Sequence, residues 1–259
     1  MLEQETIDRL HELRLPKMAD AYLAQDSDEH WKQADFDTRF AALVDAEHRS
    51  RVSNRRIRLL KLANLDQPHA RLEEINYTSG RKLDRRLIER LGGCRYIDDY
   101  RNIFITGATG EGKTYLACAL AYEAIQRDIR TLFVRMPDFL TDMELARRNG
   151  DLKRTLKKYT NPRLLVLDEW LLVPPNEQEV RDIAELIQKR RRHASTIFCS
   201  QYDDSEWIEQ LGNAEGPLAE AILDRIIHDA YRIKIEAIDP DKDISMREVY
   251  GLHEEDEVN

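Results

Sequence analysis

A glycine-rich loop directly before a helix-prone segment is the most chemically informative stretch of this sequence. It lies in the run N-I-F-I-T-G-A-T-G-E-G-K-T, residues 102–114, where a β-branched apolar segment leads into the loop. Glycines without a Cβ allow backbone N–H groups to close around anionic oxygens, and a helix N-terminus adds partial positive charge. Strand, G-x-x-x-x-G-K-[ST] and helix together form the P-loop pattern, which predicts a site for the phosphates of a nucleoside triphosphate.

Two side chains at the end of this loop have distinct expected roles. Lys113 can reach the β- and γ-phosphates, and the Thr114 hydroxyl can bind magnesium. A chance match in a glycine-rich turn is the alternative, but only 10 of the 259 residues are glycine, and Gly107, Gly110 and Gly112 fall within this loop. We expect ATP to be held by the consecutive residues Gly107, Ala108, Thr109, Gly110, Glu111, Gly112, Lys113, Thr114 and Tyr115.

An acidic pair follows a second apolar strand. The run L-L-V-L-D-E, residues 164–169, ends in Asp168 and Glu169. Such a run is a weak signal alone, but downstream of a P-loop it is the Walker B pattern. Asp168 would then hold magnesium with Thr114, and Glu169 would orient and polarise the attacking water. A glutamate at this place indicates hydrolysis by water rather than phosphate transfer to a bound metabolite.

Ser200 is a further candidate, because it ends another apolar run at residues 196–199. Its hydroxyl could contact the γ-phosphate or the attacking water. A lone serine at a strand end is also a common local cap, so both interpretations stay open at this point.

Strands and helices alternate around these motifs. Apolar runs predict five strands, at residues 103–106, 131–135, 164–167, 196–199 and 231–235. Helical periodicity fills the intervals, with Pro137, Asn176 and Pro217 at expected helix starts. The pattern predicts an α/β fold, a parallel five-stranded sheet flanked by helices on both faces, which binds ligands at the carboxyl ends of its strands.

The first part of the chain has helical periodicity without a strand pattern. A helix is expected over residues 3–25, interrupted at Pro16, and a second one after an N-cap at Asp35, with a polar connector at residues 26–29. Gln67-Pro68 marks a boundary. We therefore predict an all-helical domain at residues 1–66 and an ATPase domain at residues 67–259 that ends in an acidic tail.

Two basic stretches are candidate nucleic-acid contacts. One covers residues 49–61 and includes Arg55 and Arg56. The other covers residues 147–163, where an expected short helix at 152–159 would carry one positive face. With few aromatic or amide side chains nearby, the contact would be to the phosphates of duplex DNA rather than to base edges. Because 34% of the chain is charged, a solvated surface is the alternative for both stretches, and an acidic partner protein is a further alternative for residues 49–61. The members of the second face are Lys153, Arg154, Lys157 and Lys158.

Net charge and cysteine placement limit which partners and which cellular compartment fit this sequence. The net charge is −9, so any DNA contact must come from local patches. The cysteines Cys94, Cys118 and Cys199 show no metal-ligand spacing. Cys118 and Cys199 lie in apolar segments and fit buried free thiols, which suits a reducing compartment. The acidic start is not typical of a signal peptide, and no apolar run is long enough to cross a membrane. We therefore expect a cytoplasmic protein without a membrane partner.

Five segments give the sequence a specific resemblance. They are L-x-x-L-R-L-P-x-M at residues 10–18, I-N-Y-T-S-G-R-K-L-D-R at 75–85, G-A-T-G-E-G-K-T-Y-L-A at 107–117, L-D-E-W at 167–170 and I-L-D-R-I at 222–226. With these segments, over about residues 2–250, the chain resembles the IstB-like transposition ATPases. That family is related to the DnaC helicase loader within the initiator branch of the AAA+ superfamily.

The resemblance implies a five-stranded AAA+ core, ATP-dependent self-association into a higher oligomer on DNA, and a transposase encoded alongside as partner. It also implies an extra helical insert at residues 137–158. Arg225 would supply an arginine finger to a neighbour's ATP, a role that suits a permanently charged planar fork. An ion pair with Asp224 or Asp229 is the alternative for Arg225.

Two departures from the family pattern are visible. Leu171 and Leu172 follow Trp170 where relatives often have a glycine, which leaves the conformation of this loop open. The stretch after the fifth strand is short, so we expect little or no C-terminal lid.

Three rival functions remain. A DnaC-like replicative helicase loader would use the same chemistry on another client. A P-loop kinase for small molecules is disfavoured by Glu169 and by the lack of an arginine-rich lid in the sequence. A nucleotide-dependent scaffold would carry its basic stretches only as solvated surface.

Overall fold

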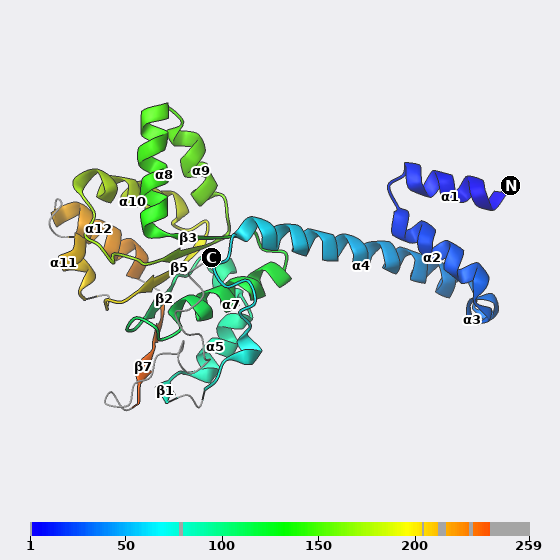
Figure 1. The fold of residues 1–259 in the computed structure, drawn as a ribbon, viewed down its shortest axis with the longest axis horizontal. Helices are drawn as coiled ribbons and strands as arrows, with labels where there is room; N and C mark the ends of the chain where they lie inside the picture. Colours follow the sequence, from blue (N-terminus) through cyan, green and yellow to red (C-terminus); the bar gives the residue numbers. More distant parts are fainter. Residues whose placement is uncertain (1, 78–79, 204, 212–215, 228–229, 239–259) are drawn as a thin grey trace, which may run out of the picture. The chain divides into compact units, whose positions relative to one another are not determined.

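The computed structural model describes residues 2–77, 80–203, 205–211, 216–227 and 230–238 (Figure 1). It divides into two compact units, Met1–Arg58 and Leu59–Asn259, which are described separately below. The division falls inside a helix that ends at Ala63, shortly before the boundary predicted after residue 66. The predicted boundary itself stays a prediction.

The first unit is helical, as expected, but its first expected helix is two helices. Pro16 begins the second of them, because its fixed φ suits a first helical position. The expected connector at residues 26–29 is also wrong, since Asp28 caps a further short helix by accepting from the His30 N–H. Asp35 acts as predicted, accepting from the Thr38 N–H at 2.9 Å. The helices are α1 (Leu2–Glu12), α2 (Pro16–Ser27), α3 (Glu29–Gln33) and α4 (Phe36–Ala63).

The second unit is built on a parallel sheet of the five predicted strands, which confirms the α/β fold class (Figure 1). The strand order is β3-β4-β5-β2-β6, and all neighbouring pairs are parallel. The strand that leads into the P-loop therefore lies between two others. The strands are β2 (Ile103–Thr106), β3 (Thr131–Arg135), β4 (Leu164–Asp168), β5 (Ser195–Ser200) and β6 (Tyr231–Lys234).

Alternate side chains of β2, β3, β4 and β5 enter different cores, so these four strands are covered on both faces. Ile103 and Ile105 pack with α5 (Arg85–Gly92), α6 (Arg95–Asp98) and α7 (Lys113–Gln126). Phe104 points to the other core, in which it packs with Phe198 and Trp207. That core is completed by α8 (Met136–Asn149), α9 (Leu152–Thr160), α10 (Glu177–Arg190), α11 (Trp207–Leu211) and α12 (Gly216–Ile227).

A second, small sheet was not predicted. Strand β1 (Arg81–Lys82) pairs antiparallel with β7 (Glu236–Ala237), which follows β6 closely along the chain. A short 3₁₀ helix, η1 (Leu72–Glu74), precedes this pair. Strands of two residues leave no periodic signal in a sequence.

Local signals fix most of the helix ends. Asn176, an expected helix start, forms a capping box with Glu179 at the start of α10, and Gly150 ends α8 in the left-handed conformation. Asp151 stands at the N-cap position of α9, but its side chain makes no cap hydrogen bond. Helices α8 and α9 lie where the helical insert was expected.

Two further expectations concern the membrane and the end of the chain. In the part of the chain that the structure covers, no helix combines the length and the apolar character needed to span a bilayer. The expected short stretch after the last strand falls mostly on residues 239–259, outside the described residues.

All three cysteines are free and buried. Burial raises the pKa of the Cys94 thiol to about 11 and that of Cys118 to about 12. Burial also raises the pKa of Cys199 well above its ordinary value. These thiols are therefore protonated packing groups at neutral pH.

Candidate active site

The P-loop leaves β2 after Thr106 and enters α7 at Lys113. Three of its residues, Gly107, Gly110 and Gly112, have φ values of 151°, 82° and 89°, which side chains with a Cβ adopt only with strain. The loop therefore needs the glycines that the motif supplies. It brings the first N–H groups of α7 and the Lys113 ammonium to one place.

Lys113 lies over this loop. Its Nζ donates to the carbonyl oxygens of Gly107 and Ala108, at 2.8 and 2.6 Å. Burial lowers the pKa of the ammonium, while the charges of Glu111 and Asp168 oppose that shift. A cation that is bound only to neutral carbonyls can exchange them for phosphate oxygens, which bind it more strongly.

Thr114 of the P-loop motif and Asp168 of the Walker B motif are in direct contact. Thr114 Oγ1 donates to Asp168 Oδ2 at 2.8 Å, and Asp168 Oδ1 accepts from the Glu169 N–H at 3.0 Å. Asp168 is 7% exposed. A hydroxyl and a carboxylate are the hard oxygen donors that magnesium prefers, and magnesium usually takes few protein ligands beside phosphates and waters. The pair therefore fits a magnesium ion.

A left-handed backbone conformation and an ion pair fix the position of Glu169. It has φ 55°, and buried Leu171 has φ 54°, so the loop left open by the sequence makes two left-handed residues here. Between them the Trp170 N–H donates to the Cys199 carbonyl at 2.8 Å, which ties the loop to β5. Arg135 NH1 lies 3.6 Å from Glu169 Oε1. Sequence reasoning missed Arg135, because only the register of β3 against β4 brings it opposite Asp168.

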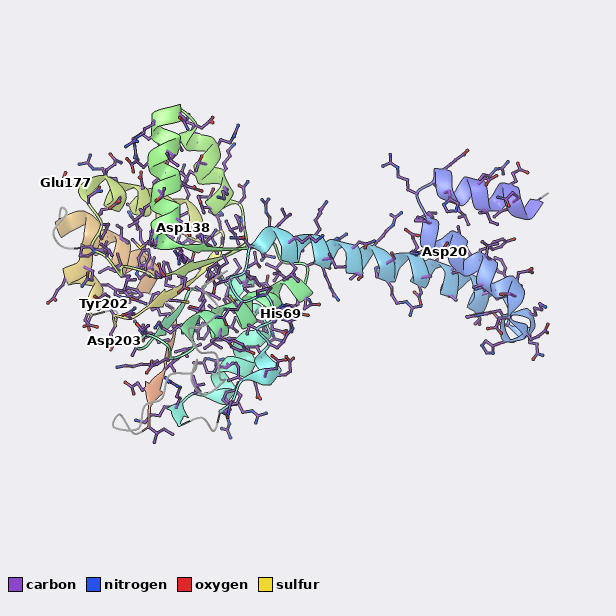
Figure 2. The ribbon with its side chains drawn as sticks, viewed as in Figure 1. Asp20, His69, Asp138, Glu177, Tyr202 and Asp203 are labelled. Atoms are coloured by element: carbon purple, nitrogen blue, oxygen red, sulfur yellow. The ribbon has the colours of Figure 1, made fainter. Side chains whose placement is uncertain are left out.

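The contacts of Ser200 do not support its expected catalytic role. The residue is 1% exposed, and its hydroxyl donates to the Trp170 carbonyl while accepting from the Tyr202 N–H and the Trp207 indole. Tyr202 and Asp203 continue the chain beyond β5 (Figure 2). These three contacts fit the strand-end cap that was the alternative interpretation, and the catalytic role of Ser200 stays a prediction.

Two of the residues expected to hold the nucleotide contact other parts of the protein through their side chains. Glu111 is buried and pairs with Arg81, so only its backbone is suited to face phosphates. The Tyr115 hydroxyl accepts from the Arg71 N–H at 3.2 Å and lies 3.1 Å from Glu74 Oε2. Tyr115 thus joins α7 to the segment around η1. The sequence contained no spacing that would link these residues.

Arg225 lies on α12 and lines a cavity of about 690 Å³. The other charged residues of the lining are four arginines and two aspartates: Arg101, Arg190, Arg191, Arg192, Asp99 and Asp224. Among the residues that the structure describes, Arg225 makes no ion pair, and the alternative partner Asp229 lies outside them. The lining also includes Asn102 and Thr196, at the amino ends of β2 and β5. The cavity and the P-loop therefore lie at opposite edges of the sheet.

The four basic residues predicted on one helix face are exposed on α9. Lys158 pairs with Asp142 at 2.8 Å, and Arg154 lies 4.0 Å from Asp151. Lys153 and Lys157 make no ion pair within the described ranges. Buried Arg190 anchors the end of α9, donating to the carbonyls of Tyr159 and Pro162 at 2.9 and 2.8 Å.

The other candidate basic residues belong to the first unit. Arg55 is exposed on α4, and Arg56 is half-buried there.

Lys113→Ala should raise the Kd for ATP by about 100-fold or more, since hydrogen bonds to charged groups contribute about 1.5–3 kcal/mol each. Calorimetric titration with ATP measures this. Lys189→Ala is a matched control, because Lys189 is an exposed lysine of the same unit that pairs with Glu185. Binding by Lys113→Ala within a few-fold of wild type would show that the nucleotide binds elsewhere.

The five-stranded parallel sheet, the P-loop and the acidic pair at the end of β4 define an ATPase of the AAA+ class. The family of IstB-like ATP binding proteins matches residues 8–242. The chain belongs to this family, as its sequence motifs predicted.

Individual relatives agree with that assignment. The insertion sequence ATP-binding protein y4pL of Sinorhizobium fredii is 36% identical over 238 residues, covering 91% of this chain and 95% of the relative. The crystal structure of DnaI has a TM-score of 0.56 at 23% identity, over 65% of this chain and 92% of that one. The DnaC helicase loader has a TM-score of 0.51 at 20% identity, over 64% and 97%. These two structures share the fold of the ATPase unit.

Proposed function

We propose that this ATPase assembles with ATP on duplex DNA and regulates a transposase encoded beside it. The family membership and the insertion-sequence names of its relatives support the connection with transposition. Magnesium, when bound, would neutralise charge on the phosphates. Thr114 and Asp168 would hold that ion, Lys113 would hold the β- and γ-phosphates, and Glu169 would accept the proton of the attacking water.

The position of Arg225 is the observation that carries the assembly step. It lies at the amino edge of the sheet, whereas the P-loop lies at the carboxyl edge. Parallel strands of four residues span about 13 Å, so Arg225 is too distant to reach its own chain's phosphates. A guanidinium in a cavity lined by further arginines is suited to a triphosphate that a second copy presents. The hydrolytic site would then be complete only between two copies.

The exposed face of α9 supports the DNA contact. It carries four cations on a helix that Arg190 ties to the core, so the charges are presented on a fixed element. A fixed row of cations suits the regular phosphates of a duplex and does not read bases. Because Lys158 is already paired with Asp142, Lys153 and Lys157 are the stronger candidates for phosphate contacts.

Lys153→Ala combined with Lys157→Ala should weaken binding to unrelated duplexes by similar factors and spare ATP binding. For each lysine–phosphate pair that the substitutions remove, the slope of log affinity against log salt should flatten by about 0.9. Fluorescence anisotropy at several salt concentrations measures both effects. Lys189→Ala is again the control for an exposed lysine elsewhere in the unit. An unchanged slope would move the DNA-binding surface elsewhere, and Arg55 and Arg56 on α4 would be tested next.

Molecular mass in solution tests the whole proposal. We expect growth of the assembly with ATP, and further growth when duplex DNA is added. A scaffold would grow with ATP and ignore DNA, and a small-molecule kinase would stay small in both. Addition of the neighbouring transposase or of a replicative helicase then distinguishes the two clients, since only the true client should change the rate of ATP hydrolysis.

A further inference from the structure

A buried carboxylate lies inside the phosphate-binding loop. The Glu111 side chain is 5% exposed, and its Oε2 lies 2.1 Å from where a Cβ on Gly107 would stand. An uncompensated negative charge at this place would repel an incoming triphosphate, because like charges interact strongly away from bulk water.

Arg81 supplies the compensating charge. Its NH1 lies 3.3 Å from Glu111 Oε1, and its side chain is 3% exposed. The pair is therefore shielded from solvent on both sides. Removing one partner from such a pair leaves a buried charge and is far more damaging than removing both.

Backbone contacts connect the strand pair that carries Arg81 with the phosphate-binding loop. Arg81 stands opposite Ala237 in the β1–β7 pair, and the Ile235 N–H just before β7 donates to the Thr106 carbonyl at 2.8 Å. Thr106 is the last residue before Gly107. The Ile235 carbonyl would lie 2.6 Å from a Cβ on Gly107, so the residue that leads into β7 lies close against the loop.

From these contacts we propose that Arg81 is a positioning residue for nucleotide binding. It neutralises Glu111 and holds the carboxylate against Gly107, so that Lys113 and the loop amides meet the triphosphate without a competing negative charge. The inference rests on the P-loop being the nucleotide site, and it adds to that site a residue that does not itself touch the phosphates.

Titration of the full-length chain with ATP and ADP tests this role. Arg81→Met should raise the Kd for ATP about tenfold or more, as expected for an uncompensated unit charge within roughly 10 Å of the phosphates. The loss should be smaller for ADP, which carries less charge. Arg81→Met with Glu111→Gln should recover most of the affinity, and Arg81→Lys should lose less than Arg81→Met. Lys82→Met, an exposed neighbour on the same strand, is the control and should bind as wild type.

Three results would overturn the proposal: normal ATP affinity in Arg81→Met, a double variant that binds no better than Arg81→Met, or equal losses for ATP and ADP. If Arg81→Met does not fold, the double variant decides, because it lacks both buried charges and must fold and bind ATP. A wild-type chain that binds no ATP would instead refute the nucleotide site itself. Lys113→Ala shows how much ATP affinity is lost when that site is damaged directly.

Discussion

Glu169→Gln is expected to bind ATP nearly as wild type and to hydrolyse it about 100-fold more slowly or worse. The amide cannot accept the proton of the water, and a positioned general base contributes about 10²–10⁴ in rate. The carboxylate follows the magnesium candidate Asp168 directly and is one-third exposed, so a water can reach it. Phosphate release at steady state and calorimetric titration measure the two quantities.

The same variant should hold the ATP-bound assembly, because the state before hydrolysis cannot decay. Its mass in ATP should stay high over times in which the wild-type assembly shrinks. Glu177→Gln is a matched control, because Glu177 is an exposed glutamate at the start of α10 (Figure 2). Its Oε2 lies 3.8 Å from Arg181 NH2. Normal turnover in Glu169→Gln would mean that another group activates the water.

Arg225→Ala should lower turnover by about 10³-fold, the effect of losing a finger that stabilises transition-state charge, while ATP binding stays close to wild type. The decisive measurement is mixing. Arg225→Ala and Lys113→Ala are each expected to be inactive, but together they should recover part of the activity. One copy then offers an intact phosphate loop, and the other offers an intact arginine.

The control for this experiment is Arg191→Ala, which removes another arginine from the same cavity. If general positive charge were sufficient, Arg191→Ala and Arg225→Ala would lose activity equally. Absence of recovery at every mixing ratio, with both variants folded and still associating, would argue against action between copies. An intramolecular role of Arg225 would then be tested.

Much of the ATPase fold was predictable because its signals are local. Each strand of the large sheet is a short apolar run, and the predicted limits agree with the structure to within one residue, as for residues 164–167 against Leu164–Asp168. The P-loop is similar, since its glycines and Lys113 are neighbours in sequence. The meeting of Thr114 with Asp168 followed from parallel strands ending at one edge.

Long-range partners were not predictable from local patterns. Arg81 and Glu111 meet only because two very short strands pair across most of the unit. Arg135 reaches Glu169 through the register of neighbouring strands, which no single segment encodes. The partners of Ser200 were hidden for the same reason, because the carbonyl and the indole that contact its hydroxyl come from Trp170 and Trp207.

The three buried thiols can be used to measure how often individual segments of this chain open. Alkylating reagents attack the thiolate, and burial keeps Cys94, Cys118 and Cys199 protonated and covered. Each cysteine should therefore be modified only when its own segment opens, and its labelling rate reports how often that happens. Cys118 lies on the helix that follows the P-loop, and Cys199 lies beside the Walker B loop on β5. Peptide mapping after a timed pulse of alkylating reagent would thus compare how often the P-loop helix and the Walker B side of the hydrolytic centre open, with no engineered cysteine.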